Sequence, residues 1–174
     1  DVYKRQLSDL GADVIKVEAP WGDDSRTWGP PFQQGFDGGE VASYFLSCNR
    51  GKKIVFANLK NERERVRSLM DTVDVVIENF KPGAFDRLLG PVKPDVIVCC
   101  ISGYGQEGPR RDEPAFDLTM QARSGIMSVT GEEDGPPAKV GVAWIDVMTG
   151  MNAVSSILAC LLRRNRGGGG ARID

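Results

Sequence analysis

Short apolar runs separated by segments of helical character constrain the fold of this chain more than any other feature. None of the runs alternates with polar residues. The runs are residues 14–17, 54–56, 74–77 and 95–101. Continuous apolar runs of this length are typical of strands that are covered on both faces. Predicted helices at 61–70 and 82–89 separate three of these runs, so we expect an α/β fold with a Rossmann-like, doubly wound parallel sheet.

The second part of the chain is predicted to be mainly helical. A helix is expected at 115–123, and a long helix with a wide apolar stripe at 145–164 ends the fold. The four glycines at 167–170 follow a helix, so we interpret them as a linker or tight turn and not as a phosphate loop. Two long irregular stretches, 19–39 and 103–114, are predicted to be functional loops or interfaces.

Composition excludes several classes of function. The chain has 24 acidic and 22 basic residues, a net charge of −2, so we expect neither nucleic acid nor a membrane surface as a partner. Arg163, Arg164 and Arg166 are interpreted as cations at a helix C-terminus. No stretch is predicted to match the roughly 20 apolar residues of a membrane span. The chain contains no histidine, which excludes Ser-His, Cys-His and His-metal mechanisms within it.

The four cysteines do not indicate a metal or redox site. They are Cys48, Cys99, Cys100 and Cys160, and no two of them form a CxxC pair. We interpret them as buried thiols of a protein in a reducing compartment.

Asp146 is the leading candidate for a chemically active side chain. It lies in the segment GVAWIDVMTGM (141–151) and is the only charged residue from 140 to 162. One interpretation is structural, because a carboxylate at the entrance of a helix accepts backbone N–H bonds and caps it. The other is chemical, because a carboxylate can attack an activated carbonyl and form an acyl intermediate. Thr149 and Gly150 would leave room for a ligand, and the residues alone leave both interpretations open.

Seven sequence blocks follow one another in order along the chain. They are LSDLGADVIKVE (7–18), GDDSRTWGPPF (22–32), NRGKKIVFANLK (49–60), VVIENFKPGAFDRL (75–88), ISGYGQEGP (101–109), AFDLTMQARSG (115–125) and residues 135–174. This series resembles the family III coenzyme A transferases from Leu7 onward. Within the family, residues 23–32 and 102–109 are most similar to enzymes that act on succinyl-CoA and on glutarate or hydroxymethylglutarate.

The resemblance implies transfer of coenzyme A from an acyl-CoA thioester, here succinyl-CoA, to a carboxylic acid such as glutarate. It places the family's catalytic aspartate at Asp146, which forms a mixed anhydride and then an aspartyl-CoA thioester. No metal is implied. The residues that it implies as contacts for coenzyme A are Asn58, Leu59, Lys60, Asn79, Phe80, Arg87, Phe116 and Asp117. Lys60 and Arg87 are suited to bind phosphate oxygens, and Phe80 or Phe116 to contact adenine or pantetheine. A structural interpretation is equally ordinary, in which the two cations are solvated and the rings belong to the core.

The chain departs from the family pattern in several places. Ala19 stands where the family often has an arginine that contacts coenzyme A, and Pro114 where a lysine can occur. The segment GPVKP at 90–94 replaces a longer family segment that carries a helix. Residues 1–6 precede the first block and are a candidate non-native extension. We interpret residues 7–174 as part of the family's large domain, with the rest of that domain and the small domain missing, and expect this fragment to be inactive alone.

Two alternative functions are weighed against transfer. α-Methylacyl-CoA racemases share the implied fold and a similar aspartate, but their partner histidine would fall at Phe116, which cannot exchange a proton. A non-catalytic nucleotide-binding or interaction module would need no carboxylate at Asp146. The resemblance also implies an interlaced homodimer. We expect the protein to reside in the cytoplasm, or in the mitochondrial matrix if it is eukaryotic.

Overall fold

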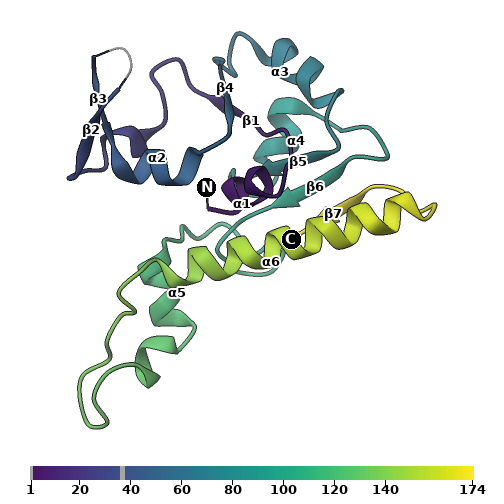
Figure 1. Ribbon diagram of the computed structural model, residues 1–174. Coiled ribbons are helices and arrows are strands. Elements are labelled where there is room, and N and C mark those ends of the chain that lie inside the picture. Colours follow the sequence, from purple (N-terminus) through teal and green to yellow (C-terminus); the bar gives the residue numbers. More distant parts are fainter. Residues whose placement is uncertain (1, 36–37) are drawn as a thin grey trace. The chain divides into compact units, whose positions relative to one another are not determined.

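The chain forms two compact units, one ending at Met70 and the other beginning at Asp71. The computed structural model describes residues 2–35 and 38–174, and Figure 1 follows them in sequence order. Residue 1 of the candidate extension and residues 36–37 of the first irregular stretch lie outside the described residues.

The described part of the first unit contains a pair of parallel strands. β1 (Ile15–Glu18) runs beside β4 (Lys53–Phe56), with Ile15 opposite Lys53. Helices, a 3-10 turn and an antiparallel hairpin accompany this pair. They are α1 (Val2–Asp9), η1 (Asp24–Thr27), β2 (Phe32–Gln34) with β3 (Glu40–Ala42), α2 (Ser43–Asn49) and α3 (Arg63–Met70). Helix α1 packs against α2.

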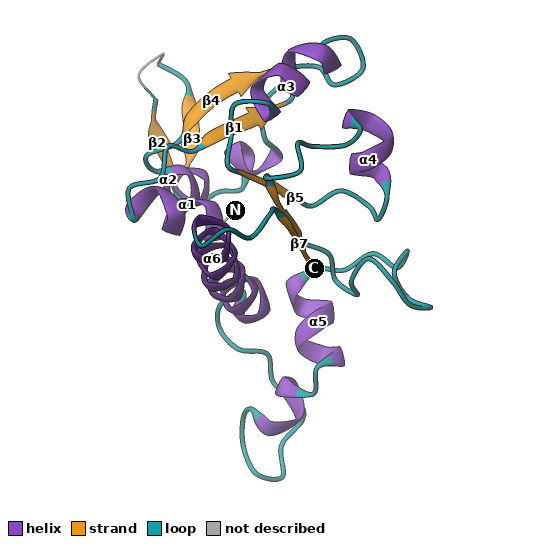
Figure 2. Ribbon diagram, turned by 90° about the vertical axis from the view of Figure 1, so that its right-hand side faces the viewer, coloured by secondary structure: helices purple, strands orange, loops and turns teal. Residues whose placement is uncertain are grey.

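The second unit contains a three-stranded parallel sheet in the order β5-β6-β7. Its strands are β5 (Val75–Glu78), β6 (Ile97–Cys100) and β7 (Ala171–Ile173). All four residues of the central strand β6 are buried, as its continuous apolar run predicted. Its helices are α4 (Ala84–Leu89), α5 (Asp117–Arg123), η2 (Ile126–Val129) and α6 (Trp144–Asn165), and Figure 2 distinguishes them from the strands by colour.

The predicted α/β class with parallel strands is confirmed, and each predicted strand lies within a few residues of an observed one. The described strands nevertheless pair in separate sheets and not in one continuous sheet. The β2–β3 hairpin and helix α2 are not among the elements predicted from the sequence. Because the residue before α2 is Ala42, which has no side-chain cap, no start signal marks this short helix.

Strand β1 reverses the expected distribution of polarity. Its buried side chains are Lys16 and Glu18, whereas Val17 between them is 38% exposed. Lys16 Nζ donates to Asp23 Oδ2 at 2.6 Å, and Arg26 Nε donates to Glu18 Oε2 at 2.9 Å. Buried charges persist only when they are paired. The interpretation of 14–17 as a purely apolar strand is therefore wrong, because partners from the following loop allow charged residues to lie inside.

Helix α6 confirms the predicted long helix, although β7 follows it. It packs against β6 and β7 through a buried face. The buried residues of this helix are Gly150, Ala153, Val154 and Ile157. Near its C-terminal end, Arg164 donates to Asp95 O at 3.2 Å and to Asp74 Oδ1 at 2.6 Å. Because these two aspartates precede β6 and β5, α6 ends at the amino edge of the sheet, and it begins on the carboxyl side.

Helix α6 also has the length and apolar composition of a membrane-crossing helix, contrary to the prediction that no stretch of the chain matches one. Core helices of folded domains meet the same two criteria. The contacts of α6 with β6 and β7, and the bonds of Arg164 to the segments before β5 and β6, are those of a helix in an α/β unit.

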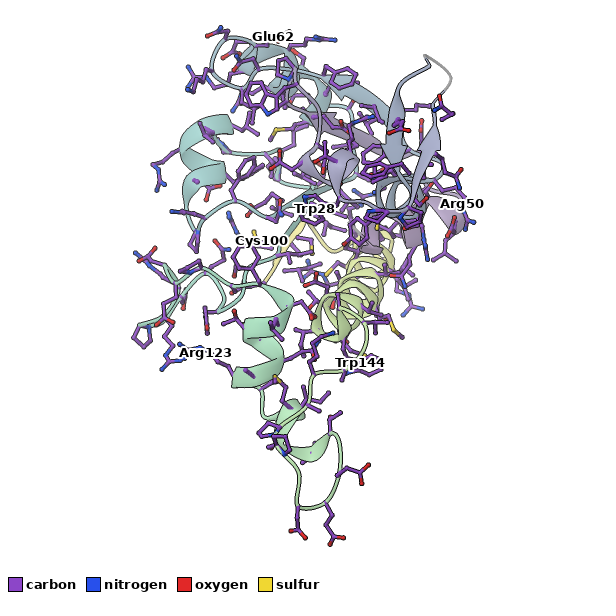
Figure 3. All side chains as sticks on the ribbon, turned by 90° about the vertical axis from the view of Figure 1, so that its left-hand side faces the viewer. Trp28, Arg50, Glu62, Cys100, Arg123 and Trp144 are labelled. Carbon is purple, nitrogen blue, oxygen red and sulfur yellow. The ribbon has the colours of Figure 1, made fainter. Side chains whose placement is uncertain are left out.

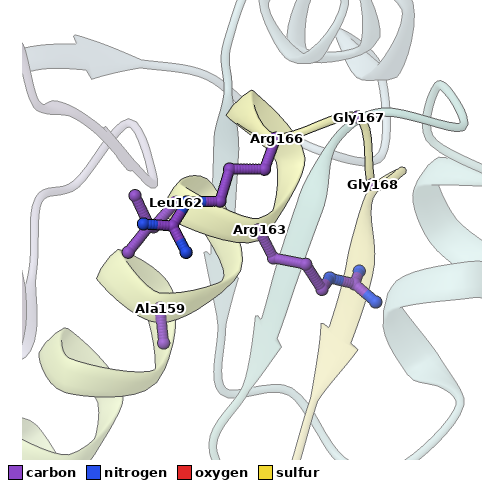
Figure 4. Close-up of a pocket in the computed structure, with 6 residues that line it drawn as sticks. All are labelled: Ala159, Leu162, Arg163, Arg166, Gly167 and Gly168. Atoms are coloured by element: carbon purple, nitrogen blue, oxygen red, sulfur yellow. The ribbon is translucent and has the colours of Figure 1, made fainter.

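The glycines after α6 form a tight connection to β7, as predicted. Arg163 donates to Gly169 O at 3.1 Å and to Gly170 O at 2.7 Å. A Cβ at Gly170 would stand 2.6 Å from Pro94 O, so this position requires glycine. Figure 4 shows an open hollow lined by Ala159, Leu162, Arg163, Arg166, Gly167 and Gly168. It lies at a helix C-terminus, whose dipole disfavours anions.

Candidate active site

Asp146 lies in the first turn of α6, two residues after Trp144, which Figure 3 labels at the start of the helix. Its side chain is exposed. Within the described residues the Asp146 carboxylate accepts no hydrogen bond and forms no ion pair. The first intrahelical bond runs from Val147 N–H to Ala143 O at 3.0 Å, and Ala143 has no side-chain acceptor. Asp146 therefore does not cap the helix on which it lies.

Asp117, the first residue of α5, caps α6 in its place. Asp117 Oδ1 accepts from Ile145 N–H at 2.8 Å and from Asp146 N–H at 3.2 Å. These are two of the N–H groups that a helix leaves without an intrahelical partner. A carboxylate at this end also has a favourable interaction with the helix dipole. A carboxylate therefore does cap α6, as the structural interpretation predicted, but the capping residue is Asp117 and not Asp146.

The surroundings of Asp146 change its acidity. Although Asp146 is exposed, part of its carboxyl is desolvated by neighbouring groups, which raises its pKa above the ordinary value, and the negative charge of Asp117 raises it further. Both effects disfavour the ionised form. The Asp146 anion therefore has little compensating stabilisation, as a reactive carboxylate requires.

The residues beside Asp117 and Asp146 differ in their exposure to solvent. Phe116, next to Asp117, is 76% exposed, so it is not the core ring of the structural interpretation. Thr149 is half-buried, whereas Gly150 lies on the buried face of α6. The space that Gly150 was expected to leave for a ligand is therefore on the packed side of the helix.

A second group of implied contacts surrounds the loop after β5. Asn79 and Phe80 are exposed, and Phe80 N–H donates to the buried Glu78 Oε2 at 2.8 Å. Arg87 of α4 folds back over Gly83, since its Nη1 lies 3.1 Å from where a Cβ on Gly83 would stand. Asn79, Phe80 and Arg87 thus gather at the carboxyl end of β5.

The third group, Asn58 to Lys60, follows β4 in the first unit. Asn58 Oδ1 accepts from Lys60 N–H at 3.0 Å and its own N–H donates to Glu62 Oε2 at 2.9 Å, which fixes the turn. That bond and Arg65 lower the pKa of the Glu62 carboxyl. Leu59 is half-buried, and Lys60 is exposed with no ion pair among the described residues.

All three groups follow carboxyl ends of parallel strands or lie on that side of a sheet. The Phe80 loop and the start of α6 share the carboxyl side of the β5-β6-β7 sheet. The turn at Asn58 follows β4 beside the end of β1, where Ala57 N–H donates to Glu18 O at 2.9 Å. Open parallel sheets bind ligands at this edge, outside the carboxyl ends of their strands.

The thiols are poor candidates for the reactive group. Cys48, Cys99 and Cys100 are buried and free, as predicted, whereas Cys160 is half-buried. Burial and the adjacent Glu78 raise the pKa of Cys99 to about 11 and that of Cys100 to about 12. A thiol with such a pKa is almost wholly protonated at neutral pH. Among the described residues, no cluster of three or more potential metal ligands occurs.

Gln121, which links Asp117 to the loop before α6, is not among the site residues predicted from the sequence. Gln121 is 1% exposed, and its amide donates to Asp117 Oδ2 at 2.6 Å. The available signal was the spacing, because residues four apart on a helix lie on one face.

Known proteins match the chain over nearly all of its length. The family described as CoA-transferase family III matches residues 2–174. A succinate–glutarate CoA-transferase of Agrobacterium fabrum is 46% identical over 98% of this chain and 45% of its own length. A succinyl-CoA:glutarate CoA-transferase of Mus musculus is 44% identical over 97% of this chain and 39% of its own length. The crystal structure of a CaiB/BaiF family protein from Brucella suis superposes with a TM-score of 0.94, at 46% identity, over 99% of this chain and 48% of that one.

These matches agree with the fold and with the order of the sequence blocks. The chain belongs to the family III CoA-transferases. It spans about half the length of the relatives that it matches. Both of these curated relatives carry names that specify glutarate together with succinate or succinyl-CoA.

Proposed function

We propose that the complete protein transfers coenzyme A from succinyl-CoA to a dicarboxylate such as glutarate, with Asp146 as the nucleophile. One observation supports the role of Asp146 most directly: its carboxylate lies exposed in the first turn of α6 and accepts no hydrogen bond from the residues that the structure describes, while Asp117 caps the helix. The names of the similar proteins support the choice of acids.

The proposed reaction proceeds through two kinds of covalent intermediate. An Asp146 oxygen attacks the thioester carbonyl of the donor, the C–S bond breaks, and a mixed anhydride and the CoA thiolate form. The thiolate attacks the aspartyl carbonyl of the anhydride and releases the donor acid as a carboxylate, which leaves an aspartyl-CoA thioester. The acceptor carboxylate then attacks this thioester and expels the thiolate. The thiolate attacks the acceptor carbonyl of the second anhydride, which yields the new acyl-CoA and restores Asp146.

Chemical trapping tests this assignment. Wild-type full-length enzyme incubated with succinyl-CoA and then hydroxylamine should carry a hydroxamate at residue 146, detected by peptide mass spectrometry. An Asp146→Asn variant should carry none, because an amide cannot form the anhydride. A hydroxamate on another carboxylate, or an active Asn variant, would refute the proposal. The same experiment separates a transferase from a non-catalytic module, which would not be acylated.

We assign the contacts for coenzyme A to the exposed groups at the carboxyl ends of β4 and β5. Lys60 and Arg87 are exposed cations without an ion pair among the described residues, and Phe80 and Phe116 are exposed rings. Asn58 and Leu59 precede Lys60 in the chain, and Asn79 precedes Phe80. The Asp117 carboxylate is already engaged by α6 and Gln121, so we assign any contact at that position to its backbone.

Substitution of the two cations tests this part of the proposal. Lys60→Ala and Arg87→Ala should each raise KM for the acyl-CoA about 5- to 20-fold and change kcat less than about 3-fold, because phosphate contacts are similar in ground and transition states. Steady-state kinetics with a fixed acceptor acid measure both constants. Unchanged KM with a collapse of kcat would show that these cations do not hold the cofactor moiety.

The racemase alternative is not supported. The position where its histidine would fall is Phe116, and the similar proteins are named as transferases.

We further propose a homodimer in which the exposed apolar residues of α6, including Met151, Leu158 and Leu162, are covered. We also propose that the protein binds neither nucleic acid nor membranes and resides in the cytoplasm or the mitochondrial matrix. Size determination in solution tests the dimer.

A further inference from the structure

Gln121 has a buried side chain near the candidate active site whose amide is hydrogen-bonded at both ends. Its Oε1 accepts from Val140 N–H at 2.8 Å, and its Nε2 donates to Val142 O at 3.1 Å and to Asp117 Oδ2 at 2.6 Å. Both ends of the amide are therefore bonded, and the side chain is 1% exposed. Any single change in its donor and acceptor pattern would leave a buried polar group without a partner, which is costly.

These bonds join α5 to the segment that leads into α6. Val140 and Val142 lie just before the helix, and Asp117 holds the N–H groups of Ile145 and Asp146. One amide thus fixes the approach to α6 directly and its first turn through Asp117. The bonds span 19 to 29 residues of sequence, so they are tertiary contacts and not part of the helix itself.

The arrangement determines what remains available to Asp146. Asp117 Oδ1 accepts the hydrogen bonds of the N–H groups at the second and third helical positions. These N–H groups therefore do not require the Asp146 side chain as an acceptor. Its oxygens keep their lone pairs free for attack on a carbonyl carbon. If Asp117 rotated away, the same N–H groups would attract the Asp146 carboxylate and draw it out of the attacking position.

We propose that Gln121 is a positioning residue that acts through Asp117: it holds the Asp117 carboxylate on the first turn of α6 and so keeps the Asp146 carboxylate unbonded and correctly placed. This inference rests on the proposed role of Asp146 as nucleophile. Under this proposal, Asp117 has a structural role near the reacting atoms and does not contact coenzyme A through its carboxylate.

A reversed pair of substitutions in the full-length enzyme tests the coupling. Gln121→Glu places an oxygen opposite Asp117 Oδ2, and Asp117→Asn places an NH₂ group opposite Gln121 Nε2, so each single variant breaks their bond. In the double variant the Asn NH₂ can donate to the Glu carboxylate, while Asn Oδ1 still accepts from the two helix N–H groups. Gln33→Glu, on the exposed strand β2, is the matched control for the added charge.

The measurement is the single-turnover rate constant of acylation by succinyl-CoA, together with KM. Gln121→Glu should lower the rate constant at least ~10-fold with KM changed less than ~3-fold, because small misplacement of a reacting group costs on the order of 100-fold. The double variant should recover at least about 3-fold relative to Gln121→Glu, as coupled residues are non-additive. Gln33→Glu should match wild type.

A role in stability alone would give another result. It would lower the acylation amplitude, which counts folded molecules, and leave the rate constant unchanged. That outcome, or a double variant no faster than Gln121→Glu, would overturn the inference. If Gln121→Glu does not fold, Asp117→Asn alone is decisive: a raised KM with an unchanged rate constant would indicate a cofactor contact and overturn the inference. Absence of a hydroxamate at residue 146 in wild type would instead refute the proposed function.

Discussion

At the scale of single residues, two aspartates near one helix end have different surroundings and different expected roles. Asp117 accepts two backbone N–H bonds and one side-chain bond, whereas Asp146 accepts none among the described residues. A carboxylate stabilised by several donors is a weak nucleophile, and an unbonded one is a stronger nucleophile. Geometry thus separates a structural carboxylate from a candidate reactive one.

Substitutions of Asp146 and of Asp117 should differ in their effect on the free energy of unfolding. The raised pKa of Asp146 means that its ionised form is disfavoured in the folded state, so its charge lowers stability at pH 7. Asp146→Asn should therefore leave the free energy of unfolding unchanged or raise it, while Asp117→Ala should lower it by about 1–2 kcal/mol through loss of the cap. Urea unfolding at pH 7 measures both. A clear loss of stability in Asp146→Asn would restore the view that Asp146 caps the helix.

The pH dependence of acylation should respond to Asp117. Asp146 must be ionised to attack, so the rate should rise with pH through a pKa that burial and the charge of Asp117 have raised. Asp117→Asn removes that charge and should move the acidic limb to lower pH, even though the maximal rate falls. Single-turnover acylation between pH 4 and pH 8, roughly the range of perturbed carboxyl groups, measures the limb. A limb that stays in place would show that the two carboxylates do not interact.

At the scale of elements, the connection from α6 to β7 is shaped by its close approach to the segment that precedes β6. Gly170→Ala should lower the free energy of unfolding by about 2–4 kcal/mol, because the new Cβ would stand 2.6 Å from Pro94 O. Gly141→Ala is the control, since a Cβ there meets nothing within 4 Å, and it should change stability by less than about 1 kcal/mol. Equal effects of the two substitutions would contradict the close approach.

At the scale of the whole molecule, the proposed reaction is complete with a carboxylate and a thiolate. The thioester is already an activated acyl group, so no Lewis acid has to polarise it. We expect the full-length enzyme to keep its transferase activity in EDTA, measured by the formation of a new CoA ester. Loss of turnover with recovery on addition of a divalent ion would show that this account of the chemistry is incomplete.

The amino-acid sequence by itself determined the local features of this protein. Apolar runs of strand length located β4, β5 and β6, periodic apolar positions located α6, and an isolated charge singled out Asp146. Each of these signals depends on residues that are close in the chain. The absence of histidine likewise limits the chemistry that is open to the chain, whatever its fold.

Only the tertiary structure decided which groups meet. It brought Asp117 to a helix that begins 27 residues later, enclosed Gln121, and paired Lys16 and Glu18 inside β1 with charges from the next loop. These arrangements arise because a buried polar group takes whichever partner the fold brings within reach, and local patterns of polarity do not encode that partner. The sequence could therefore identify an acid at the start of α6, but only the structure showed that a different acid caps it.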